Sequence, residues 1–113
     1  MKELKVICRK ERVEDVVAAL RAAGVPRLTV SHVHSLGSGV DPEHYRMSFE
    51  EGAAHTEKAK IELVCRSADV PQLLDAIRQY GCTGQRGDGV IFVTEIERVV
   101  KIRTGDENAL ALL

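Results

Sequence analysis

Apolar and polar positions alternate near the start of the chain and then change to a longer period. Leu4, Val6 and Cys8 occupy every second position, which is the pattern of a half-buried β-strand. Apolar residues then recur at the i, i+3, i+4 and i+7 spacing of an amphipathic helix, at Val13, Val16, Val17 and Leu20. Gly24 predicts the end of this helix, because glycine adopts the left-handed conformation that often closes one.

A second alternating segment follows at residues 28–35, and the rest of the chain repeats the same order of elements. Residues 60–65 alternate as a strand, and the helical spacing returns at Val70, Leu73, Leu74 and Ile77. Asp69 is placed to cap this second helix, Pro71 suits its first turn, and Gly81 predicts its end. The chain therefore contains two consecutive β-α-β units.

Apolar runs at residues 90–93 and 99–103 predict further strands near the carboxyl terminus. Two β-α-β units in series collect their helices on one face of an antiparallel sheet, so we predict an α+β fold, a ferredoxin-like βαββαβ sandwich. Residues 37–57 show no sustained period, which predicts a long loop between strands 2 and 3. We expect residues 1–113 to form a single domain, because the chain is too short for two.

The composition argues against a nucleic-acid-binding protein and against a membrane-spanning one. Sixteen Lys and Arg against 17 Asp and Glu give a formal charge of -1, and aromatic residues are 4%. The chain thus lacks the basic and aromatic surface that binds nucleic acid. It has no apolar run of the roughly 18 residues needed to cross a bilayer, and we expect no signal segment because residues 1–5 already follow a strand pattern. Three cysteines without a CxxC motif fit a cytoplasmic protein with reduced thiols.

Two motifs in the last third of the chain are suited to binding phosphate. The sequence TGQRGDG at residues 83–89 has three glycines, whose backbone amides can converge on phosphate oxygens. An ordinary turn between a helix and a strand is the alternative interpretation. Lys101 and Arg103 are two positions apart, so on a strand they would share one face and pair with phosphate charge. A solvated strand face is the alternative there.

These motifs resemble the carboxy-terminal signature of the P-II nitrogen-regulator family, over TGQRGDGVIFV at residues 83–93 and IRTG at residues 102–105. Residues 28–30 and 60–64 are also similar to their family counterparts, as is Gly37. The resemblance extends over nearly the whole chain and needs no gap. It implies a regulatory protein rather than an enzyme, a homotrimer that binds an adenine nucleotide in the clefts between its subunits.

Carried over position by position, the resemblance assigns residues to this site. The implied nucleotide-binding set is Thr29, Gly37, Glu62, Val64, Gly87, Asp88, Gly89, Lys101 and Arg103. Thr29 and Val64 would lie near the adenine, and Glu62 beside the ribose or base. The glycines and Asp88 would offer backbone groups to the phosphates, and the two cations would pair with phosphate charge. Lys58 matches the lysine with which the family binds 2-oxoglutarate.

Several positions depart from the family pattern. Val90 stands where the family has a phosphate-contacting lysine, Ser38 where an arginine reaches the γ-phosphate, and Gly39 where a glutamine binds magnesium. Each lost charge-assisted hydrogen bond weakens binding by about 1.5–3 kcal/mol. ADP or AMP is therefore favoured, ATP is the alternative, and magnesium is disfavoured. Glu51 replaces the family's modified tyrosine, which excludes uridylylation there.

The resemblance also implies that the loop of residues 37–57 docks on a membrane transporter or a metabolic enzyme, in nitrogen or carbon metabolism. The histidines support a different function, a divalent-metal-binding or metal-tolerance protein on the same trimeric ferredoxin-like frame. His32 and His34 are two apart on one predicted strand, so their rings would point the same way and would need His44 or His55 to complete a metal site.

Overall fold

The computed structural model describes residues 1–35 and 56–112. Its main elements, in chain order, are β1 (Lys2–Arg9), α1 (Val13–Ala22), β2 (Thr29–Ser35), β3 (Thr56–Cys65), α2 (Val70–Gly81) and β4 (Gly89–Glu95). Short 3-10 turns are η1 (Lys10–Arg12), η2 (Ser67–Asp69) and η3 (Asn108–Leu112). The predictions for Gly37, Ser38, Gly39, His44, Glu51 and His55, and for most of the loop 37–57, lie outside the described residues.

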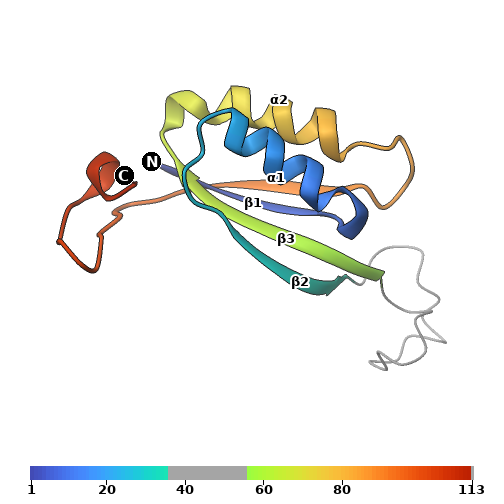
Figure 1. The fold of residues 1–113 in the computed structure, drawn as a ribbon, viewed down its shortest axis with the longest axis horizontal. Helices are drawn as coiled ribbons and strands as arrows, with labels where there is room; N and C mark the ends of the chain where they lie inside the picture. The colour runs from blue at the N-terminus through green and yellow to red at the C-terminus, as the bar shows by residue number, and fades with distance from the viewer. Residues whose placement is uncertain (36–55, 113) are drawn as a thin grey trace.

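The four strands form one sheet in the order β2-β3-β1-β4, and every neighbouring pair is antiparallel. Both helices cover the same face of this sheet (Figure 1). The predicted ferredoxin-like α+β fold is therefore confirmed. In the described part of the chain, no helix is long and apolar enough to cross a membrane.

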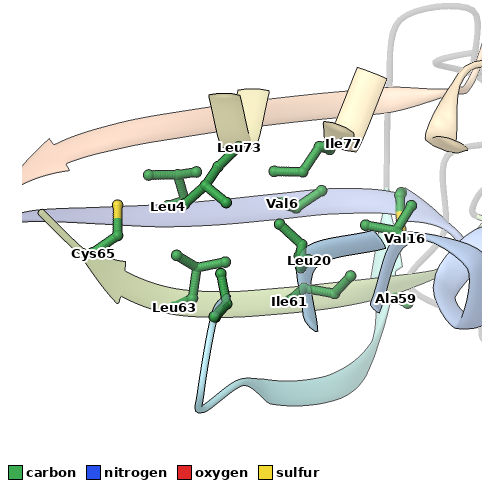
Figure 2. Packing of buried hydrophobic residues seen from close by; sticks show 12 residues of the cluster. Leu4, Val6, Val16, Leu20, Ala59, Ile61, Leu63, Cys65, Leu73 and Ile77 are labelled. Carbon is green, nitrogen blue, oxygen red and sulfur yellow. The ribbon is translucent and has the colours of Figure 1, made fainter. Parts of the chain in front are cut away.

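The core fills the space between the helices and the central strands (Figure 2). Its buried side chains include Leu4, Val6 and Cys8 of β1, Val16 and Leu20 of α1, Ala59, Ile61, Leu63 and Cys65 of β3, and Leu73 and Ile77 of α2. These are the positions that the two sequence periods place on one face of each element. Cys8 and Cys65 are free thiols, and burial raises the pKa of both.

The first residues of β3 and the cap of α2 differ from the sequence prediction. Strand β3 begins at Thr56, so the predicted loop is two residues too long. Glu57 belongs to this strand because it pairs with His34 in the register, and its carboxylate accepts a 2.9 Å hydrogen bond from Lys10. Asp69 precedes α2 but does not cap it, because its carboxylate is bound to Arg66 at 3.0 Å.

Residues 99–103 do not form the predicted strand. The Lys101 N–H donates to Asp106 O at 2.8 Å, and the Gly105 N–H donates to Lys101 O at 2.8 Å. These bonds close a tight turn, which Gly105 permits by adopting a φ of +75°. The prediction that Lys101 and Arg103 share a strand face is therefore wrong, because the segment is a turn at the end of a short hairpin.

Candidate functional site

One cleft of about 700 Å³ contains five of the nine residues predicted to bind nucleotide. They are Thr29, Glu62, Val64, Lys101 and Arg103. The cleft lies where the start of β2 and the end of β3 meet the carboxy-terminal segment. Its volume is in the range that small-molecule ligands and cofactors occupy.

Two different kinds of local structure bring these five residues together. Thr29 and Glu62 are directly opposite each other in the β2–β3 pairing. Glu62 alternates with the buried Ile61 and Leu63, so both members of the pair lie on the sheet face that the helices leave uncovered. The cations come from the hairpin after β4, where Val100 pairs with Glu107 and the carboxylate of Glu107 is bound to Arg98. The cleft thus offers a hydroxyl and a carboxylate from the sheet and two cations from the hairpin.

The remaining predicted residues within the described part lie at the opposite end of the sheet. Gly87, Asp88 and Gly89 belong to the turn between α2 and β4, and Lys58 lies near the start of β3. Lys58 and Val64 are separated by about 20 Å along β3, at a strand rise of roughly 3.3 Å per residue. Figure 1 shows the carboxy-terminal hairpin and this turn at opposite ends of the sheet.

The side chain of Asp88 organises the glycine-rich turn from within. Its carboxylate accepts hydrogen bonds from the backbone N–H groups of Thr83 at 2.8 Å and Gly84 at 3.0 Å, and from the Thr83 hydroxyl. A fourth bond comes from Arg9 Nε at 2.9 Å. The Thr83 hydroxyl, followed by Arg9, holds the pKa of Asp88 well below its ordinary value. The carboxylate of Asp88 therefore supports the turn from within.

Arg9 belongs to this site but was not predicted from the sequence. Besides Asp88, its guanidinium donates to Arg86 O at 2.7 Å, and the Lys58 ammonium donates to Gly87 O. Lys58 is buried, with a relative exposure of 7%. Arg9 is opposite Lys58 in the β1–β3 register. Only this pairing of distant strands places Arg9 next to the turn, and no local sequence pattern predicts it.

The network around Asp88 predicts sensitivity to acid. A lowered pKa in the folded chain means that the ionised carboxylate stabilises the fold above the ordinary aspartate value of about 4, and that this stabilisation is lost as the pH falls below it. The wild-type melting temperature should therefore fall below about pH 4, whereas Asp88→Asn should start lower and change less over that range.

Thermal unfolding between pH 6 and pH 2 measures this effect. Asp75→Asn is the matched control, because Asp75 is exposed on α2 and its carboxylate makes no hydrogen bond or ion pair within the described residues. Equal acid sensitivity in Asp88→Asn and the wild type would contradict the role given to Asp88.

The described histidines do not assemble a metal site. His32 and His34 are both exposed on β2, which is an edge strand. Among residues 1–35 and 56–112, no group of three His, Cys, Asp or Glu side chains is arranged to hold a metal ion. The partners proposed for these histidines, His44 and His55, lie outside the described residues.

The strands and helices define an α+β domain of the ferredoxin-like class, with a cleft at one end of its sheet. The chain belongs to the family described as Nitrogen regulatory protein P-II, whose profile matches residues 1–106. It is 37% identical over 113 residues to Nitrogen regulatory protein P-II of Microchaete diplosiphon and 34% over 112 residues to that of Pasteurella multocida. It is also 33% identical over 112 residues to Nitrogen regulatory protein GlnK of Escherichia coli K12. Each comparison covers 99% of this chain and 100% of the relative, which confirms the resemblance seen in the sequence.

Proposed function

We propose that this chain is a signalling regulator rather than an enzyme, a single domain of residues 1–113 that forms a homotrimer and binds an adenine nucleotide between its subunits. The observation that carries the proposal is the separation of the predicted residues into two groups at opposite ends of one sheet. A nucleotide in the cleft of one chain touches the glycine-rich turn only if that turn comes from a second copy. A head-to-tail contact of this kind closes into a ring when its rotation allows.

The uncovered face of the sheet supports association. Val90 and Phe92 lie on it, opposite Ile7 and Lys5 in the β1–β4 register, and their relative exposures are 47% and 51%. An apolar face and two open sheet edges are stabilised by burial against other copies. We propose that the sheets of three subunits face one another in the trimer.

The charges in the cleft favour a nucleotide with few phosphates. Lys101 and Arg103 are the cations of the predicted set, and the exposed position 90 carries a valine instead of a third cation. Each charge-assisted hydrogen bond contributes about 1.5–3 kcal/mol. ADP or AMP therefore binds at least as tightly as ATP in this proposal, and magnesium has no assigned ligand. A small anion such as 2-oxoglutarate would meet Lys58, whose ammonium is bound to Gly87 O in this structure.

We further propose that residues 37–57 carry the specificity for the regulated partner, a transporter or a metabolic enzyme in the cytoplasm. The support is the family relationship together with the position of this segment, which joins β2 to β3 close to Lys58. The alternative metal-binding function has no specific observation in its favour within the described residues.

Calorimetry and light scattering test this function. Light scattering should give three times the mass of the 12.4 kDa chain. Calorimetry should give ADP an affinity at least equal to that of ATP. A variant in which a Gly-Ser linker replaces residues 41–55 should keep both properties and lose capture of the native partner from lysate. A monomer, or a tenfold preference for ATP, would overturn the proposal.

A further inference from the structure

The carboxy-terminal turn η3 forms part of the wall of the candidate nucleotide cleft. Ala111 and Leu112 line the cleft together with Val64, Thr29 and Glu62. None of the motifs in the sequence pointed to these last residues. We infer that Leu112 packs against the nucleobase and is a specificity-determining residue of the site; this inference rests on the proposed function.

The turn is directed back onto the sheet by a particular backbone conformation. Asn108 has a φ of +56°, in the left-handed region that asparagine adopts more readily than most residues. Its N–H donates to Val99 O at 2.8 Å, which fixes the turn to the base of the hairpin. Ala111 is then buried, with a relative exposure of 6%. The turn η3 is thus held in place by the hydrogen bond of Asn108 and by the buried side chain of Ala111.

Different lining residues suit different parts of a nucleotide. Phosphate oxygens need cations, and the hairpin supplies Lys101 and Arg103. The faces of an aromatic base are apolar and its edges carry hydrogen-bonding groups, which suit the Thr29 hydroxyl and the Glu62 carboxylate. An apolar side chain that lines the same cleft as these two polar groups can cover a ring face. Leu112 supplies that surface, together with Val64.

A second, mainly apolar cavity of about 400 Å³ adjoins the cleft. The two cavities share Pro26, Val64 and Leu112 in their linings. Leu112 is only partly buried and is not part of the main core. Its truncation should therefore alter the cleft while the fold is retained.

The experiment compares ADP with inorganic pyrophosphate, which has no base, by calorimetry and displacement. Leu112→Ala should weaken ADP binding about 5- to 20-fold, as expected for the loss of one well-packed leucine side chain, and should leave pyrophosphate binding unchanged. Leu112→Met should restore most of the ADP affinity. The matched control is Leu110→Ala, because Leu110 lines only the second cavity and is 60% exposed; ADP affinity should not change.

The outcomes separate this inference from the proposed function. A wild-type protein that does not bind ADP refutes the proposed function and this inference with it. Wild-type binding of ADP together with less than a twofold effect of Leu112→Ala refutes only the role of Leu112. An equal loss of ADP and pyrophosphate affinity also refutes it, because a general distortion of the cleft would then be the cause. Thermal unfolding of each variant verifies that it is folded.

Discussion

Gly89→Ala should destabilise the fold by about 3–5 kcal/mol, which is an exceptional effect for the addition of one methyl group. A Cβ atom at this position would lie 1.7 Å from Ile7 O and 3.1 Å from Cys8 Cα. Gly89 also has a φ of +111°, which side-chain-bearing residues rarely adopt. The clash is with backbone, so the β1–β4 pairing must shift to relieve it.

Gly84→Ala is the matched control, because it separates backbone strain from steric overlap. Gly84 has a φ of +85°, but a methyl group added there would meet no atom within 4 Å beyond its chain neighbours. Its substitution should cost only about 1–2 kcal/mol, the strain of the left-handed conformation alone. Urea denaturation of both variants gives the two free energies of unfolding. Similar values for the two would show that the approach of β4 to β1 is looser than described.

Gly89 also illustrates a limit of motif reasoning. The sequence pattern predicts that Gly89 binds phosphate, whereas the geometry gives a structural reason for glycine at this position, which is the close approach of β4 to β1. Likewise, the carboxylate of Asp88 is fully engaged inside the turn by Thr83, Gly84 and Arg9. Packing and internal hydrogen bonds can therefore require the same residue types as a bound ligand would.

The elements of the fold could be predicted because each depends on a local period. Leu4, Val6 and Cys8 alternate along one strand, and the second helix buries Leu73 and Ile77, as its spacing predicts. The strand order and the register are set by contacts between distant segments, which no local pattern encodes. For the same reason, the sequence did not reveal Arg9 as a partner of Asp88, since these residues are 79 positions apart.

The sequence predicted five of the residues that line the cleft, but not how they are arranged. Lys101 and Arg103 were interpreted as a strand pair because their spacing is two, whereas hydrogen bonds around Gly105 make the segment a turn. The cleft still receives both cations, because the hairpin carries them to the end of β3. Leu112 was missed because a leucine near a chain end has no distinguishing pattern; only its contact with the cleft identifies it.

Arg103→Ala should weaken ADP binding by about 1.5–3 kcal/mol, or roughly 10- to 100-fold, because a charge-assisted hydrogen bond to phosphate is lost. Gly87→Val should weaken it from the other end of the sheet. Gly87 has a φ of +97°, and a Cβ atom there would come within 3.4 Å of the cationic groups of Arg9 and Lys58. Calorimetry on each variant alone measures these losses.

Mixing the two variants tests whether one nucleotide is held by two subunits. In trimers refolded from equal amounts of Arg103→Ala and Gly87→Val, about a quarter of the clefts should combine an intact Arg103 with an intact turn from the neighbour. Those clefts should bind ADP with wild-type affinity and appear as a tight class in the titration. A mixture of Arg103→Ala and Lys101→Ala is the control, because both defects lie at the same end and no cleft becomes intact. If the first mixture also gives no tight class, each site is built within one chain and the proposed interface is wrong.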